Sequence, residues 1–245
     1  AGVVLKREDP AIRSERNRLY DLCEEAAKIF ERSFSLTPAV KSYMQKRGVK
    51  EETVRDFRVG FAPQSWDFLL KALAAKGFRK DECEKAGLAI KSEDGNSWYD
   101  RFRSRIMFPI ADGNGRVVGF SGRIFALPTE ALAKEGRWSS SAKATEDAAK
   151  YVNTPNTLIY DKSQVLYGFD KAKQEIRGKN RVVVVEGQMD CVMSHQAGVK
   201  NAVAVSGTAL TPQQLKVLRR LCDTIVSSFD TDAAGDSATK RSLAL

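Results

Sequence analysis

The sequence has few of the residues on which metal-binding or disulfide-linked domains are built. Its 245 residues include one histidine and four cysteines. The cysteines are far apart and form no C-x-x-C pair, so a Cys/His zinc site has almost no ligands available. They stand in apolar helical or strand contexts, which favours buried thiols in a reducing compartment over a disulfide framework. The four are Cys23, Cys83, Cys191 and Cys222.

Long apolar runs are also missing. No stretch approaches the roughly 18 apolar residues of a membrane-spanning helix, and the first residues, AGVVLKREDP, lack the apolar core of a signal peptide. The G-x-x-x-x-G-K-[ST] pattern of P-loop ATPases does not occur. With 42% hydrophobic and 29% charged residues, the composition is that of a globular protein, and we expect no membrane partner.

Positive charge is what the sequence has in excess. Forty Lys and Arg oppose 31 Asp and Glu, a net charge of +9, which favours a polyanionic partner. Residues 41–123 hold 17 Lys or Arg and 11 Asp or Glu, and so contribute +6 of that total. Arg101, Arg103 and Arg105 alternate along this stretch. Either they line a groove for the polyanion or they form a solvated face.

The first half of the chain has the pattern of helices followed by a hairpin. Apolar residues at three- and four-residue steps from Leu19 to Phe34 predict a long helix. Thr37-Pro38 predicts the start of a second helix, and Ser65 the N-cap of another. Residues 105–110 and 116–125 then predict two strands joined by the turn ADGNG. Residues 126–149 lose all periodicity, and we expect a surface loop there.

The last seventy residues alternate strands with helices. A run of four β-branched residues, Val182–Val185, predicts a buried strand. Two further strands are predicted at Asn201–Val205 and Thr224–Phe229, and each gap between the three has room for one helix. Such spacing predicts a parallel, Rossmann-like sheet. The predicted fold class is therefore α/β: an α+β N-terminal subdomain followed by a parallel-sheet module.

Carboxylates stand where two of these strands end. Glu186 follows the first strand, and Asp230 and Asp232 follow the third within FDTDAAG. Ligands of open parallel sheets bind beyond the carboxyl ends of the strands, and three carboxylates at one edge favour Mg²⁺. The alternative is that these side chains only cap the turns that follow the strands.

The two acidic motifs, VVVVEGQMD and FDTDAAG, are similar to the TOPRIM signature of primases, topoisomerases and some nucleases. Three further segments resemble bacterial DnaG-type DNA primases: RFRSRIMFPIADGNGRVVGFSGRIF, KYVNTPNTLIYDKSQVLYG and SGTALT. The resemblance runs in order from about Val40 to the last residue. It implies the RNA-polymerase core of a primase, with a leading helix and linker over 1–36, a basic subdomain over 37–161 and a TOPRIM module over 162–245.

The resemblance also implies a reaction and roles for the acidic residues. A primase makes RNA primers on single-stranded DNA by metal-dependent nucleotidyl transfer, with Mg²⁺ or Mn²⁺. Glu186 matches the TOPRIM glutamate, which acts on metal or as an acid/base, and Asp230 and Asp232 match the metal-binding pair. Asp190 matches a further acidic position, although a charge favoured by the helix dipole explains it as well.

Six further residues match nucleotide- or DNA-binding positions of the family. Cations of this kind hold phosphates, and an aromatic ring can stack on a base. For the tyrosine among them, simple packing explains the residue as well as stacking does. The six are Arg47, Arg123, Lys150, Tyr151, Asn153 and Lys162.

The resemblance implies partners too: a single-stranded DNA template, ribonucleoside triphosphates, and a replicative helicase bound through a C-terminal domain outside this sequence. Zinc would belong only to an N-terminal domain that is also outside it. We expect a monomer of the bacterial cytoplasm, near the nucleoid, with an organellar homologue as the alternative. The family's Asp-Pro-Asp motif does not occur here, so we expect a fragment that is weakly active or inactive alone. A TOPRIM nuclease or topoisomerase, and a non-catalytic DNA-binding module, are the rival functions.

Overall fold

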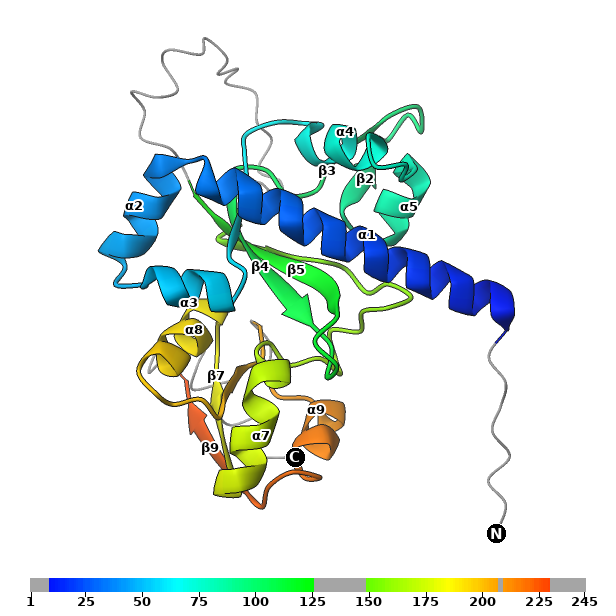
Figure 1. Cartoon of the computed structure of the whole chain (residues 1–245). Coiled ribbons are helices and arrows are strands. Elements are labelled where there is room, and N and C mark those ends of the chain that lie inside the picture. The colour runs from blue at the N-terminus through cyan, green and yellow to red at the C-terminus, as the bar shows by residue number, and fades with distance from the viewer. Residues whose placement is uncertain (1–8, 126–148, 207–208, 230–245) are drawn as a thin grey trace.

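Two lobes make up the structure, a computed structural model that describes residues 9–125, 149–206 and 209–229 (Figure 1). The upper lobe has a four-stranded antiparallel sheet crossed by the long helix α1, and a small two-stranded sheet beside it. The lower lobe has a three-stranded parallel sheet with helices α7, α8 and α9 around it. The predicted α/β fold class is confirmed.

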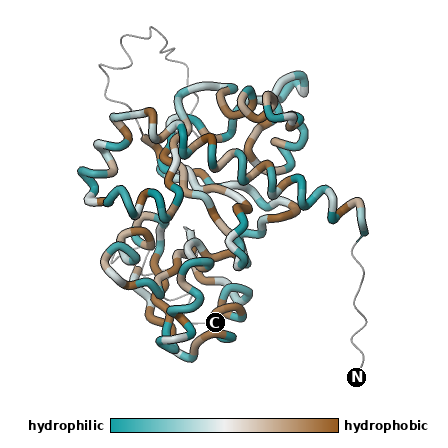
Figure 2. Tube along the Cα trace, viewed as in Figure 1, coloured by the Kyte–Doolittle hydropathy of each residue, from teal (hydrophilic) through white to brown (hydrophobic). Residues whose placement is uncertain are grey.

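Helix α1 (Pro10–Ser35) begins where Asp9 accepts a hydrogen bond from the Ala11 amide at 2.8 Å, with proline in the first turn. Its trace alternates between hydrophobic and hydrophilic segments (Figure 2), because one face packs across the antiparallel sheet. That face confirms the periodicity read from the sequence. Its buried members are Leu19, Leu22, Cys23, Ala26, Ala27, Phe30 and Phe34.

The antiparallel sheet has the strand order β1-β4-β5-β6, from β1 (Gly60–Ala62), β4 (Arg105–Ala111), β5 (Val117–Ile124) and β6 (Tyr151–Asn153). The two central strands are the predicted hairpin. Gly60 lies directly under α1, where a Cβ would come within 2.5 Å of the Phe30 Cβ, so the close approach of helix and sheet requires glycine.

Five short elements complete the upper lobe: α2 (Pro38–Lys46), α3 (Glu51–Asp56), α4 (Phe68–Ala74), α5 (Lys80–Lys85) and the hairpin of β2 (Ala89–Lys91) with β3 (Trp98–Asp100). The prediction of Ser65 as a cap was wrong. The N-cap of α4 is Asp67, and the carboxylate of Asp100 accepts hydrogen bonds from the amides of Leu69 at 2.7 Å and Leu70 at 3.0 Å. A residue thirty positions further on thus satisfies the free amides of the first turn.

The three predicted parallel strands are confirmed as β7 (Arg181–Val185), β8 (Ala202–Ala204) and β9 (Thr224–Ser228), and the structure places β7 between the other two. The helices that connect or precede its strands are α7 (Phe169–Lys179), α8 (Gln188–Gln196) and α9 (Pro212–Leu218). Val182 and Val184 of the central strand are fully buried, as expected for a strand covered on both faces.

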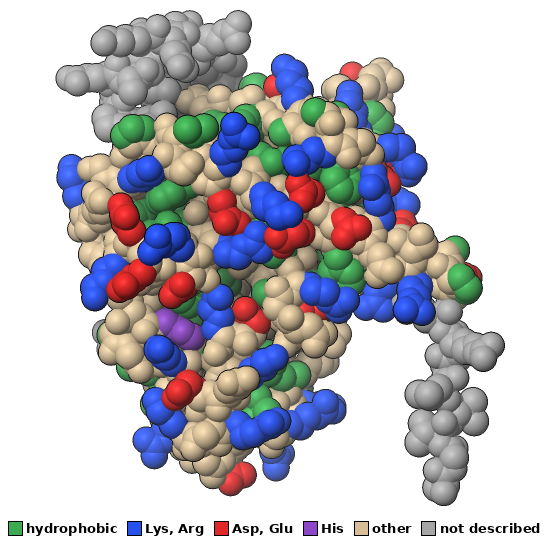
Figure 3. Space-filling model, viewed as in Figure 1, with side chains coloured by type: hydrophobic (Ala, Val, Ile, Leu, Met, Phe, Trp, Pro, Cys, Tyr) green, Lys and Arg blue, Asp and Glu red, His purple; other side chains and the backbone are tan. Residues whose placement is uncertain are grey.

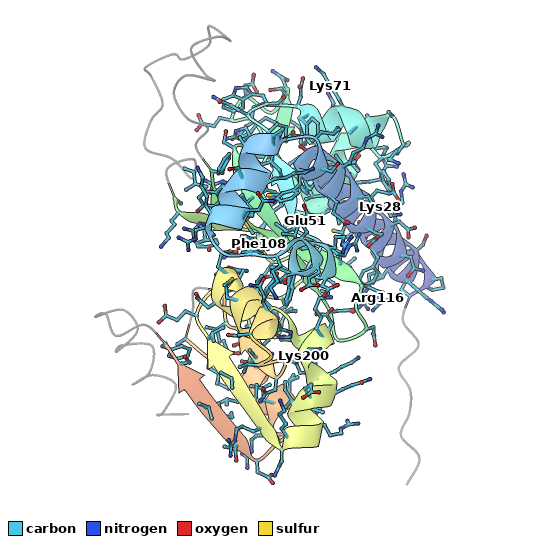
Figure 4. All side chains as sticks on the ribbon, turned by 60° about the vertical axis from the view of Figure 1, so that its left-hand side comes forward. Lys28, Glu51, Lys71, Phe108, Arg116 and Lys200 are labelled. Atoms are coloured by element: carbon cyan, nitrogen blue, oxygen red, sulfur yellow. The ribbon has the colours of Figure 1, made fainter. Side chains whose placement is uncertain are left out.

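The hydrophobic core does not stop between the lobes. One cluster joins α1 and the antiparallel sheet to Met189, Cys191 and Val192 of α8, and a second lies under α7 and α9. Helix α8 therefore packs on the upper lobe as well as on its own sheet. In Figures 1 and 4 it lies directly below α3.

All four cysteines are buried free thiols, as predicted, and burial raises the pKa of Cys23 to about 12, so that thiol is inert. No helix in the part of the chain that the structure describes is long and apolar enough to cross a membrane.

Candidate metal and nucleic-acid site

The acidic edge of the parallel sheet begins where β7 ends. Glu186 follows Val185 and is half-buried. Gly187 then caps α8, and the Asp190 carboxylate accepts a hydrogen bond from the Gly187 amide at 3.1 Å. A Cβ on Gly187 would lie 3.0 Å from that carboxylate oxygen, so glycine keeps the acidic turn tight. Asp190 is exposed, and its second oxygen is not used by the cap.

The neighbouring strand leads to the other predicted carboxylates. Strands β7 and β9 are paired in parallel, with Val185 opposite Ser228, so their carboxyl ends share one edge. Asp230 and Asp232 follow β9 but lie outside the described residues. Within the described part of the chain, no three His, Cys, Asp or Glu side chains group around a metal position. The three-carboxylate site therefore stays a prediction.

A basic and aromatic pair from the antiparallel sheet reaches this acidic edge. Arg123 on β5 donates from Nη1 to the Tyr151 hydroxyl of β6 at 3.0 Å, and its guanidinium lies 5.6 Å from the ring centroid. Burial is the largest single effect on Arg123 and lowers its pKa, but the Tyr151 and Tyr43 hydroxyls together outweigh burial and leave the pKa of Arg123 raised. Burial raises the pKa of Tyr151, and the Asp190 carboxylate adds to the rise, while Arg123 opposes it. Arg123 and Tyr151 thus form one hydrogen-bonded pair, and the charge of Asp190 acts on its tyrosine.

Asn153 makes a second link between the lobes. Its Nδ2 donates to the Ser206 carbonyl at 3.5 Å, while its buried Oδ1 has no hydrogen-bond partner among the described residues. Ser206 has φ +61°, a left-handed conformation that is uncommon outside glycine. The strand β6 therefore meets the loop that leaves β8, and Gly207 and Thr208 of that loop lie outside the described residues.

Comparison with known protein families shows which family the chain belongs to. Residues 29–173, more than half of the chain, match the family described as DNA primase catalytic core, N-terminal domain. The chain belongs to the DNA primase catalytic core family. Residues 183–245 match a Toprim-like family, so the acidic edge coincides with that second match.

Individual primases are similar over nearly the whole chain. The DNA primase of Halalkalibacterium halodurans is 36% identical over 248 residues, which cover 99% of this chain and 38% of that protein. The RNA polymerase domain of Mycobacterium tuberculosis primase DnaG has a TM-score of 0.79 and 36% identity, covering 94% of this chain and 72% of that one. A DnaG primase catalytic domain bound to ssDNA has a TM-score of 0.77 and 33% identity, covering 94% and 67%. The chain therefore spans 38% of the length of that curated primase.

The remaining primase positions lie on several different elements. Lys150 is exposed directly before β6, and its carbonyl accepts from the Ile124 amide at 2.9 Å. Lys162 is half-buried, and its carbonyl accepts from Gln214 Nε2 of α9 at 3.3 Å. Arg47 is exposed at the end of α2. The functions of these residues, like those of the carboxylates, stay predictions.

Gln188 is the first residue of α8, directly after the Gly187 cap. The side chain is 2% exposed, and its Nε2 has no hydrogen-bond partner in the described structure. A buried amide donor without a partner costs free energy, so this position is less well satisfied than the capped turn beside it.

Neither interpretation of the arginine triplet fits Arg105. It is 1% exposed and donates from Nη1 to the Gly122 carbonyl at 3.2 Å and the Ala149 carbonyl at 2.9 Å. The guanidinium holds the chain at Ala149, one residue before Lys150. Arg105 thus supports the site from inside the protein and faces neither a groove nor solvent.

Sequence reasoning missed an aromatic and cationic group at the edge of the upper lobe. Trp66 is 63% exposed, and the Arg103 guanidinium lies 4.3 Å from the centroid of the Trp66 ring and 5.2 Å from that of Tyr99. The two rings meet edge to face at 5.4 Å. The available signal was the run of aromatic and arginine residues from 98 to 103.

The positive charge is not one uniform patch. On the face shown in Figure 3, Lys and Arg side chains cover both lobes, with Asp and Glu among them. Some cations are neutralised locally: Arg58 forms ion pairs at 2.8 Å with Glu24 and with Glu31 of α1. Affinity for a polyanion would therefore come from particular cations rather than from the net charge.

Proposed function

We propose that the protein containing this chain is a DNA primase, which makes short RNA primers on single-stranded DNA for replication. One observation carries the proposal: Glu186 directly follows β7, which is paired with β9, in a chain whose residues 29–173 match the primase catalytic core. That match also favours a primase over a TOPRIM nuclease or topoisomerase. A similar DnaG catalytic domain is bound to ssDNA, which supports a single-stranded template.

The reaction is a nucleotidyl transfer. The 3′-hydroxyl of one ribonucleotide attacks the α-phosphate of the next, a phosphodiester bond forms, and pyrophosphate leaves. We assign the catalytic carboxylates to Glu186, Asp230 and Asp232, with Asp190 as a further metal ligand. Asp190 keeps an oxygen that the Gly187 cap does not use, which supports this assignment.

The carboxylates fit a hard divalent cation. Glu186 is half-buried and Asp190 is exposed at the same turn, so oxygen ligands and solvent are both at hand, as Mg²⁺ requires. Mg²⁺ or Mn²⁺ bound there would lower the pKa of the attacking hydroxyl and neutralise charge on the phosphates. Arg123 and Tyr151 form a hydrogen-bonded pair, and the charge of Asp190 acts on the Tyr151 hydroxyl, so the pair would hold the incoming triphosphate or the template near the carboxylates.

The other cations form the rest of the nucleic-acid surface in this proposal. Lys150 and Asn153 belong to the same strand region as Tyr151, and Lys162 and Arg47 belong to other segments of the chain. The partners are the template, ribonucleoside triphosphates and, through a domain outside this sequence, the replicative helicase. We propose a monomer in the bacterial cytoplasm, and the bacterial relatives support that compartment.

A primer-synthesis assay on the natural full-length protein tests the function, with wild type against Glu186→Gln. We expect the variant to lose dinucleotide formation by on the order of 100-fold or more, because the lost charge belongs to the reacting centre. Glu93→Gln, an exposed residue away from the sheet edge, is the matched control and should keep full activity. Undiminished synthesis by Glu186→Gln would refute the assigned mechanism.

A further inference from the structure

One side chain ties the loop between α2 and α3 to the far end of α8. Gln196, the last residue of α8, accepts a hydrogen bond from the Lys50 amide through Oε1 at 2.8 Å. Its Nε2 donates to the Gly48 carbonyl, also at 2.8 Å. A single amide group thus pairs with a donor and an acceptor that precede it by 146 and 148 residues.

The loop has a backbone suited to this approach. Gly48 has φ +78°, which selects glycine, whereas a Cβ there would be only in ordinary contact, 3.8 Å from the Met193 methyl of α8. At the end of α3, the Phe57 ring meets His195 edge to face at 5.1 Å. In Figure 4, Glu51 at the start of α3 is just above α8. The loop and α3 therefore rest on α8 along its second half.

Helix α8 connects this contact to the acidic edge. Asp190 lies in its first turn, and at 1.5 Å per residue the helix rises about 9 Å from Asp190 to Gln196. Arg47 immediately precedes Gly48, and Lys46, Arg47 and Lys50 are all exposed. The contacts that hold the loop on α8 therefore also set the position of these three cationic side chains relative to the Asp190 carboxylate.

We propose that Gln196 is a positioning residue, which holds Arg47 where it contacts the phosphates of the DNA template. The inference rests on the proposed function, because that function assigns the template contact to Arg47. Gln196 itself touches no phosphate and carries no charge. Its two hydrogen bonds are on the solvent-exposed side of the lobe contact, while the buried Phe57 contacts hold the lobes together. Removing Gln196 should release the loop without separating the lobes.

A double-mutant cycle on single-stranded DNA affinity tests this role. The dissociation constant of a fluorescein-labelled oligonucleotide is measured between 50 and 200 mM salt for wild type, Arg47→Ala, Gln196→Ala and the double variant. We expect Arg47→Ala to lower the slope of log K against log salt by about 0.7, the share of one single-strand phosphate contact. Gln196→Ala should lower the slope in the same direction although it removes no charge, and the double variant should match Arg47→Ala.

Two further variants separate positioning from a general loss of structure. Gln196→Met keeps the size and the neutrality of the side chain but can neither accept from Lys50 nor donate to Gly48, so the same slope as for Gln196→Ala is expected. Gln174→Ala removes an exposed amide from α7 and should bind as wild type. If Gln196→Ala keeps the wild-type affinity and slope while Arg47→Ala does not, the positioning role is wrong and the proposed function stands. If Arg47→Ala is silent as well, the template contact assigned to Arg47 is wrong, and the inference fails with it.

Discussion

Asp100 should make the stability of the upper lobe fall as the pH rises from about 4 to 6. Its side chain is 1% exposed, and burial raises the pKa of its carboxyl from 3.8 to about 6, although the Leu69 and Leu70 amides oppose that rise. Because the folded state holds the proton more tightly, this group favours folding fully below pH 4 and less as the pH passes 6. A difference of roughly two pKa units corresponds to about 3 kcal/mol.

The assay is urea unfolding of wild type and Asp100→Asn from pH 4 to 7. The asparagine keeps one oxygen to accept from the first turn of α4 but cannot ionise, so other titrating groups cancel in the comparison. We expect the free energy of unfolding of wild type, relative to the variant, to fall by about 3 kcal/mol across that range. A difference that is flat or rises with pH would show that the two amides outweigh burial, and the reasoning would be refuted.

Two other substitutions test the packing that supports the site. Arg105→Met should lower the free energy of unfolding by about 3–5 kcal/mol, because two buried carbonyls lose their hydrogen-bond donor. In the same urea-unfolding assay, the control Arg177→Met on the surface should change the free energy of unfolding by less than about 0.5 kcal/mol. Gly60→Ala should destabilise by several kcal/mol or prevent folding, since its Cβ would clash with Phe30. Gly178→Ala in α7, which meets nothing within 4 Å, should stabilise by roughly 0.5–1 kcal/mol in thermal unfolding; equal effects of the two glycine changes would contradict this account.

The spacing of hydrophobic residues along the sequence correctly predicted those helices and strands that bury one face or one run of side chains. The apolar face of α1, the β4–β5 hairpin and the three parallel strands all follow from the period of their hydrophobic residues. The residue that caps α4 could not be predicted in this way, because the acceptor, Asp100, belongs to strand β3, about thirty residues further along the chain. The prediction for Arg105 was wrong for a similar reason. An arginine at every second position of a strand gives the same sequence pattern whether its side chain faces solvent or the core.

Some residues of the candidate site could likewise be predicted from the sequence, and others could not. The strand-end carboxylates could be read directly from the sequence, because they follow predicted strands of one parallel sheet, whereas the pairing of β7 with β9 came from the structure. Arg123 and Tyr151 were named only through the resemblance to primases, and their hydrogen bond to each other had no sequence signal because it joins two different strands. The Gln196 contact with the α2–α3 loop had no sequence signal at all, because a glutamine at a helix end is typical of a solvated surface.

The aromatic contacts between the lobes have a consequence for biosynthesis. The rings of Phe57 and Phe108 pack against Tyr167, and Phe57 also packs against His195. These upper-lobe rings therefore gain some of their packing partners only when residues much later in the sequence have been synthesised. At roughly 5–20 residues per second, about 7 to 28 seconds separate Phe57 from His195 on the ribosome. Through that interval the nascent chain carries uncovered aromatic side chains, and this is when it most needs a chaperone.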